Sequence, residues 1–90
     1  MTPKPRDSLV IIRDILQVAT RKASKTEIVY RSNINFVAAE KYISRLLLGG
    51  MLETVVEDGK SRFQTTQRGM EALSKLTEVQ RLFEDAQRTV

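Results

Sequence analysis

The sequence predicts a mainly α-helical fold with one small β-hairpin, which is an α+β architecture. Apolar residues recur at helical spacing near the start of the chain, over residues 36–48 and again over residues 66–87. Between the last two segments, over residues 51–65, the apolar period changes to two around Asp58-Gly59, which is a strong hairpin signal. We therefore expect helices on both sides of a two-stranded hairpin, with the longest helix at the end.

The first helix is expected to begin at Asp7 or Ser8, either of which can cap it, and to end near Arg21. Its apolar residues lie three and four positions apart and predict one stripe that faces the core: Leu9, Ile12, Ile15, Leu16 and Ala19. Basic residues gather where this helix ends, namely Arg21, Lys22 and Lys25. These cations suit contacts with phosphate and equally suit the negative end of the helix dipole, so both interpretations stay open.

A tight polar turn is predicted to join two helices within residues 24–50. Ser24 and Glu27 stand three apart ahead of apolar residues, which is the pattern of a capping box at a helix start. Asn and Ser side chains in the connecting segment bond to nearby backbone and favour a turn over a continued helix. Asn35 is then expected to cap the second helix, which covers residues 36–48 and ends at two glycines.

The helix over residues 36–48 is predicted to bury one face and to expose another. At about 100° of rotation per residue, the buried stripe contains Phe36, Ala39, Ile43, Leu46 and Leu47. The outward side contains small residues and two cations: Val37, Ala38, Lys41, Ser44 and Arg45. A helix in the DNA major groove needs cations for phosphates or guanine and small groups for thymine methyls. An ordinary solvated helix face has the same pattern, so it remains the alternative.

A type I′ turn at Asp58-Gly59 fixes the register of the predicted hairpin, because both central residues of that turn need positive φ. In this register Glu57 faces Lys60, Val55 faces Arg62 and Thr54 faces Phe63. The inward face is expected to contain Leu52, Thr54, Val56 and Phe63, while Lys60 and Arg62 make the tip cationic. Two interpretations remain: a plain hairpin in which Glu57 pairs with Lys60, and a wing that touches DNA.

The last helix is expected to begin after Thr65 or Thr66 and to reach about Gln87. Its apolar residues follow the 3.5-residue repeat of a coiled coil: Ala72, Leu76, Val79, Phe83, Ala86 and Val90. Met70 and Leu73 are expected to pack on the preceding domain. The other apolar side chains need a partner helix, so we predict a homodimer interface formed by Leu76, Val79, Leu82, Phe83 and Ala86. The competing interpretation folds this half of the helix back over the domain, and parallel or antiparallel pairing is left open.

Composition and charge favour a folded protein with a polyanionic partner. Of the 90 residues, 41% are hydrophobic and 29% are charged, and the formal net charge is +4. Residues 1–68 hold twelve Lys and Arg against seven Asp and Glu, whereas residues 69–90 hold three against four. The basicity therefore belongs to the first part of the chain, for which nucleic acid is the commonest partner.

Several functions are disfavoured by residue types that the sequence lacks. It contains no Cys and no His, which argues against disulfides, structural zinc, thiol nucleophiles and imidazole catalysis. We therefore expect neither an enzyme nor a metal or cofactor site. Residues 1–6 lack the apolar core of a signal peptide and are expected to be a short disordered arm. With no stretch long enough to span a bilayer, we expect a cytoplasmic protein.

Helix, short helix, polar turn, helix, hairpin and long helix is the element order of a winged helix-turn-helix followed by a C-terminal dimerisation helix. We expect a DNA-binding head over residues 7–69 and a coiled-coil helix over residues 70–90. The sequence resembles the small archaeal winged-helix DNA-binding proteins, the ArnR-like class, over roughly residues 9–76. The matching features are Lys25-Thr26, Tyr30, Asn33, Asn35, Lys41-Tyr42, Gly50, Thr66 and Gly69.

The resemblance implies a protein that binds double-stranded DNA as a dimer, in some members through an antiparallel coiled coil of the final helices. The residues implied to face the major groove are Asn35, Val37, Ala38, Lys41 and Arg45, with Lys60 and Arg62 flanking the groove from the wing. The same resemblance places the two-fold seam of the dimer at Leu76, Val79, Phe83 and Ala86.

The sequence thus predicts a homodimeric protein that binds double-stranded DNA, either as a transcriptional regulator or as a nucleoid protein. Contacts with the DNA backbone are expected from Lys22, Lys25, Arg31, Ser32, Lys60 and Arg62. The alternative is a module that binds another protein without touching DNA, which the acidic residues Glu40, Glu53 and Glu57 near the basic face favour. Binding through phosphates weakens steeply with salt, whereas binding through an apolar protein interface does not.

Overall fold

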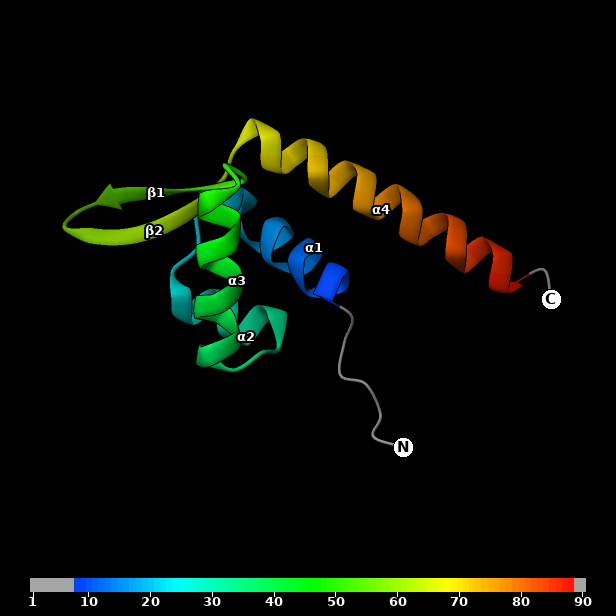
Figure 1. Cartoon of the computed structure of the whole chain (residues 1–90). Helices are drawn as coiled ribbons and strands as arrows, with labels where there is room; N and C mark the ends of the chain where they lie inside the picture. The colour runs from blue at the N-terminus through cyan, green and yellow to red at the C-terminus, as the bar shows by residue number, and fades with distance from the viewer. Residues whose placement is uncertain (1–7, 89–90) are drawn as a thin grey trace.

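Three short helices form a head from which a hairpin and a long helix project (Figure 1). The computed structural model describes residues 8–88. Its elements are α1 (Ser8–Val18), the 3₁₀ helix η1 (Ala19–Arg21), α2 (Lys25–Ser32), α3 (Phe36–Leu48), β1 (Leu52–Glu57), β2 (Lys60–Thr65) and α4 (Gln67–Arg88). This is a winged helix-turn-helix with a long C-terminal helix, which confirms the predicted fold class. The predicted arm over residues 1–6 and the predicted cap at Asp7 lie outside the described residues.

The helix-turn-helix forms from the local signals that predicted it. The Ser24 hydroxyl accepts from the backbone N–H of Glu27 at 3.1 Å, and the Glu27 carboxylate accepts from that of Ser24 at 3.0 Å. Asn33 ends α2 in the left-handed conformation with φ of 55°. Asn35 then caps α3, since its side-chain oxygen accepts from the backbone N–H of Ala38 at 2.7 Å. The reciprocal bonds between Ser24 and Glu27 fix the start of α2, and the cap bond of Asn35 fixes the start of α3.

The core lies between α1, α2 and α3, and its centre contains the fully buried Ile15, Leu16 and Ile28. Leu9 does not belong to it, contrary to the prediction, because it is 56% exposed. Ile11 and Val18 are buried instead. Helix α1 contacts α2 on one side and α4 on another, so its buried face is turned relative to the single stripe that the spacing predicted.

Helix α3 also buries a slightly different face from the predicted one. Phe36 is 47% exposed, whereas Tyr42 is buried. The hydroxyl of Tyr42 shares a hydrogen bond of 3.0 Å with that of Ser8. A buried tyrosine hydroxyl needs such a partner, and the bond joins the middle of α3 to the start of α1.

The hairpin has the predicted register, with Glu57 opposite Lys60, Val55 opposite Arg62 and Thr54 opposite Phe63. Its turn has positive φ at both central residues, 51° at Asp58 and 76° at Gly59. The predicted inward face is wrong beyond the base. Leu52 is buried, but Thr54 is exposed and Val56 is 68% exposed, because the strands extend away from the head (Figure 1).

The base of the hairpin is bonded to the head on both strands. Ala23 and Phe63 exchange two backbone hydrogen bonds, of 2.9 and 2.8 Å. The segment before α2 therefore pairs with β2 through a single antiparallel bridge, on the side of β2 away from β1. The buried hydroxyl of Thr65 donates to the carbonyl of Leu16 at 2.7 Å. Thr66 caps α4, because its hydroxyl accepts from the N–H of Gly69 at 3.1 Å, and it also donates to the carbonyl of Gly50 at 2.6 Å.

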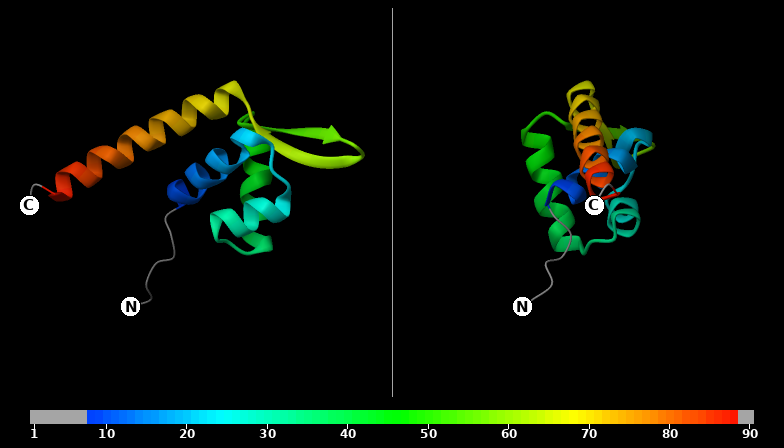
Figure 2. Two further views of the ribbon diagram at one scale, coloured as in Figure 1. Left: turned by 180° about the vertical axis from the view of Figure 1, so that it is seen from behind. Right: turned by 90° about the vertical axis from the view of Figure 1, so that its right-hand side faces the viewer.

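Helix α4 begins against this base and then leaves the head. Leu73 is buried, as predicted, but Met70 is 46% exposed and does not pack into the core. Gly69 is buried where the backbone of α4 passes close to that of Met51. The far end of α4 projects beyond the head, opposite to the hairpin (Figures 1 and 2).

Replacing Gly69 by alanine should destabilise the fold by about 1–3 kcal/mol, the usual effect of overpacking. The added Cβ would overlap the carbonyl oxygen of Met51 and would lie 2.6 Å from the Thr65 methyl. The measurement is the midpoint of thermal or urea unfolding. Gly49→Ala is the matched control, because Gly49 has an ordinary φ of −79° and its added Cβ meets nothing closer than 3.4 Å. Equal effects of the two substitutions would contradict the proposed close approach.

Candidate nucleic-acid interface

The exposed face of α3 contains Val37, Lys41, Ser44 and Leu48 along its centre. These residues lie four, three and four positions apart, so they form one stripe opposite the buried Ala39, Tyr42, Ile43 and Leu46. Val37 is 79% exposed and Leu48 is 90% exposed. Arg45 and Glu40 flank the stripe on its two sides. The structure thus exposes the two predicted cations, Lys41 and Arg45, together with Glu40 and Leu48, which were not predicted as site residues.

The side chains of this stripe make few contacts with the rest of the described residues. The Lys41 ammonium lies 5.9 Å from the centre of the Tyr42 ring, at the outer limit of a cation–π contact. Arg45 and Ser44 are exposed at the surface. A cation and a hydroxyl between two small or branched apolar groups can contact base edges, thymine methyls and phosphates.

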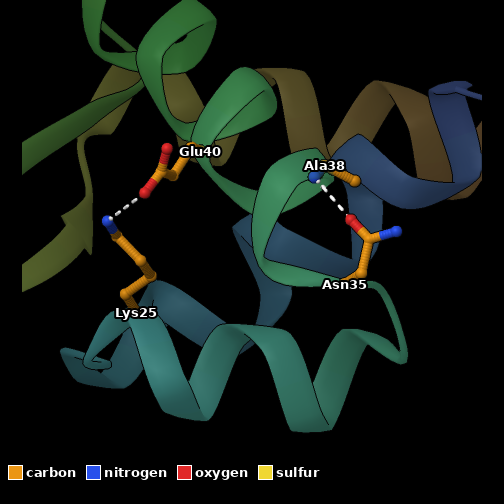
Figure 3. Close-up of polar contacts among 4 residues, drawn as sticks. All are labelled: Lys25, Asn35, Ala38 and Glu40. Carbon is orange, nitrogen blue, oxygen red and sulfur yellow. Dashed lines mark hydrogen bonds and ion pairs between the residues drawn. The ribbon is translucent and has the colours of Figure 1, made fainter.

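Asn35 and Ala38 are more constrained than the other predicted groove residues. The Asn35 side-chain oxygen is used in the cap of α3, and its amide nitrogen points away from that bond (Figure 3). Asn35 can therefore donate to an acceptor on DNA while the cap is kept. Ala38 is half-buried and packs against the hydrophobic core, so little of its methyl group faces outward.

Two of the predicted phosphate ligands are held by carboxylates of the same chain. The Lys25 ammonium, at the start of α2, lies 3.1 Å from a carboxylate oxygen of Glu40 on α3 (Figure 3). The Lys22 ammonium, at the end of η1, lies 2.7 Å from Glu57 on β1. Glu57 therefore bonds to Lys22 and not to its cross-strand neighbour Lys60, which the plain-hairpin interpretation expected.

The ion pair between Lys22 and Glu57 also affects titration. The hydrogen bond and positive charge of Lys22, with a smaller contribution from Arg62, hold the pKa of Glu57 below its ordinary value. Hydrogen bonds from the backbone and hydroxyl of Ser24 lower the pKa of Glu27, and the nearby Arg62 and Arg31 add to this effect. Arg62, which lies opposite Val55 on the hairpin, therefore carries a positive charge that acts on acidic groups of both β1 and α2.

Arg31, Lys60 and Ser32 complete the set of predicted backbone contacts. Arg31 and Lys60 are exposed, and Arg31 lines a shallow groove of about 270 Å³ with Arg21 and parts of α1. Ser32 is fully buried, and its hydroxyl has no hydrogen-bond partner among the described residues. The prediction for Ser32 is therefore wrong, because α2 turns this residue into the core and away from any DNA backbone.

The apolar residues of α4 divide into two groups. Ala72 and Leu76 pack against the core, so Leu76 has intramolecular partners that its coiled-coil spacing did not predict. Val79, Leu82 and Phe83 are 50%, 63% and 67% exposed. Ala86 is exposed as well, whereas Val90 lies outside the described residues. The uncovered apolar surface therefore begins about one turn later than predicted.

Within residues 8–88, no cluster of acidic side chains could hold a metal ion. In the same range, no helix has both the length and the apolar character needed to cross a membrane. The expectation that the protein uses no metal or cofactor stays a prediction.

Comparisons with known proteins agree on the fold. A family model described as winged helix-turn-helix matches residues 5–84. Among solved structures, the chain is similar to Sso10a-2, a DNA-binding protein from Sulfolobus solfataricus, with a TM-score of 0.85 and 26% identity over 93% of this chain and 88% of that one. These matches confirm the resemblance to small archaeal winged-helix DNA-binding proteins. No match was found among curated proteins.

More distant structures share the fold. The transcriptional regulator BldR from Sulfolobus solfataricus has a TM-score of 0.79 at 14% identity, over 91% of this chain and 61% of that one. ZitR from Lactococcus lactis, in complex with DNA, has a TM-score of 0.69 at 11% identity, over 97% of this chain and 62% of that one. The chain therefore spans about three fifths of the length of these two proteins.

The ion pair between Glu57 and Lys22 predicts a pH dependence of stability. Because the pKa of Glu57 is lowered by folding, its contribution is present above the pKa of the unfolded chain, near 4.5, and is lost as the pH falls through the lower folded value. The urea midpoints of the wild type and Glu57→Gln should differ at pH 7 and converge below pH 4.5. Glu53→Gln, on the same strand, is the control. If the urea midpoints of the wild type and Glu57→Gln differed by the same amount at pH 7 and below pH 4.5, the ion pair between Glu57 and Lys22 would be contradicted.

Proposed function

The chain belongs to the winged helix-turn-helix family, and on this premise we propose that it is a homodimer that binds double-stranded DNA. Its role is that of a transcriptional regulator or a nucleoid-associated protein, acting on DNA in the cytoplasm, and not that of an enzyme. The helices and hairpin of residues 8–69 bind DNA, and the part of α4 beyond Leu76 joins two copies. The observation that carries the proposal is the exposed, cationic face of α3 beside the wing.

In this proposal α3 enters the major groove with its exposed stripe toward the base edges. Lys41 and Arg45 contact guanine edges or phosphates, while Val37 contacts thymine methyls. Asn35 donates from its free amide nitrogen, whereas Ala38, which packs against the core, offers only the outer part of its methyl group to the groove. The similarity to a DNA-binding protein at 26% identity supports this arrangement.

Backbone contacts come from the cations around α3. Lys60 and Arg62 are on β2 of the wing, and Arg31 is on α2, which packs against α3. Lys22 and Lys25 join them once they exchange their carboxylate partners for phosphates, which is a modest change because exposed ion pairs are weak. Ser32 takes no part, since it is buried.

Dimerisation is proposed to use the end of α4. Val79, Leu82, Phe83 and Ala86 are exposed on a helix that has already left the head, and soluble monomers rarely expose so many apolar side chains together. A second copy of the same helix is the simplest cover, because the self-complementary interface then buries both stripes at once. Leu76 stays with the head and borders the seam.

Titration of a labelled mixed-sequence duplex at several salt concentrations tests DNA binding. We expect a steep fall of affinity with salt, because each phosphate contact releases about 0.9 of a counterion. The double variant Lys41→Ala with Arg45→Ala should bind at least roughly thirtyfold more weakly, at about 1–3 kcal/mol for each of the two lost base contacts. Its circular dichroism should be unchanged, since both side chains are exposed.

Lys75→Ala on α4 is the control for that variant, as it removes one exposed positive charge away from α3. Unchanged binding by the double variant would refute the assignment of α3 as the recognition helix. If the wild type bound no duplex at low salt, the same surface would instead have to dock a protein, whose binding would vary little with salt.

The dimer is tested by placing charges in the seam. Val79→Asp with Phe83→Asp should give a folded monomer, because two carboxylates per copy would be buried against each other in the pair. Sedimentation equilibrium measures the mass, and circular dichroism checks the fold. Glu78→Asp with Glu84→Asp, which keeps the charge of neighbouring exposed positions, is the control. A variant that still sedimented as a dimer would exclude α4 as the interface.

A further inference from the structure

Glu40 is an acidic residue on the DNA-facing side of a helix that needs to approach a polyanion. It follows Val37 by three residues and precedes Ser44 by four, so it lies along the edge of the exposed stripe of α3. Its carboxylate points toward α2, where it meets the Lys25 ammonium at 3.1 Å (Figure 3). The pair is open to solvent, with 41% of the Lys25 side chain and 64% of the Glu40 side chain exposed.

An ion pair this exposed is easily exchanged for another partner. Lys25 is at the start of α2, an element end that can approach the DNA backbone, and a phosphate oxygen accepts from an ammonium as a carboxylate does. When Lys25 moves to phosphate, Glu40 loses its cation. Its carboxylate then faces the duplex without a partner, which opposes binding unless the DNA supplies a hydrogen-bond donor.

In the major groove, the partner that suits a carboxylate is the exocyclic amino group of cytosine. We propose that Glu40 is a specificity-determining residue that favours cytosine in the target and opposes binding to other sequences. This inference rests on the proposed DNA binding by α3. Its basis is the juxtaposition of a carboxylate at the edge of the exposed stripe with a lysine that can bind a DNA phosphate in place of that carboxylate.

The second ion pair of the head provides a contrast. Glu57 also holds a lysine, Lys22, at 2.7 Å, but it belongs to β1 near the tip of the wing and not to α3. Its loss would free Lys22 for phosphate without changing any contact to a base edge. Substituting the two glutamates should therefore have different effects. Glu57→Gln should change the affinity for all DNA sequences alike, whereas Glu40→Gln and Glu40→Ala should change which sequences are preferred.

The experiment selects duplexes from a random-sequence library with the wild type, Glu40→Gln, Glu40→Ala and Glu71→Gln. Glu71→Gln removes the same unit charge from an exposed position on α4. The wild type and Glu71→Gln should enrich cytosine at one position of each half-site, roughly tenfold over the other bases. Glu40→Ala should lose this enrichment, and Glu40→Gln should shift it toward adenine, to which glutamine bonds in two places.

The same four proteins are then titrated with a mixed-sequence duplex at one salt concentration. Both Glu40 variants should bind it several-fold more tightly than the wild type, because the unpaired carboxylate no longer opposes binding. Cytosine enrichment that persisted in both variants, or an affinity for mixed DNA that did not rise, would overturn the inference. If the wild type bound no duplex at all, the proposed function itself would fail, so the two failures are distinguishable.

Discussion

The closed base of the hairpin is the constraint on which the other parts of the molecule depend. On one side, Thr66, the residue after the hairpin, donates from its backbone N–H to the carbonyl of Met51, the residue before it, and from its hydroxyl to the carbonyl of Gly50. On the other, Ala23 pairs with Phe63 and links β2 to the chain that enters α2. Gly69 lets α4 start against this base. These bonds connect the hairpin to the segments that lead into α2 and α4, and the wing and the far end of α4 project from the head in opposite directions (Figure 2).

Local chemistry predicted most of this fold from the sequence alone. The capping box of Ser24 and Glu27, the cap at Asn35 and the hairpin register all depend on residues within a few positions of each other. Burial was predicted less well, as Leu9 and Val56 illustrate. Periodicity identifies an apolar stripe, but which part of the stripe is covered depends on the neighbouring elements, and the sequence does not contain their positions directly.

The candidate site was predictable to a similar extent. The exposure of Lys41 and Arg45 follows from helix geometry. The partners of Lys22 and Lys25 do not, because Glu57 and Glu40 lie 35 and 15 residues away along the chain. Ser32 was misassigned for the same reason, since a polar residue near a turn is buried only when other helices cover it. A contact between distant residues has no local sequence signal.

The ion pairs of Lys22 with Glu57 and of Lys25 with Glu40 bear on how the proposed dimer would bind DNA. With Lys22 and Lys25 held by carboxylates, fewer cations of each head are free to meet phosphate, so a single head gains less from counterion release than its composition suggests. In the proposed homodimer, two heads joined through α4 would bind the same duplex, and the second contact would be intramolecular, which raises overall affinity without any new contact. Under this proposal, weak binding by each single head would keep non-specific affinity low, while a matched pair of half-sites would bind both heads at once.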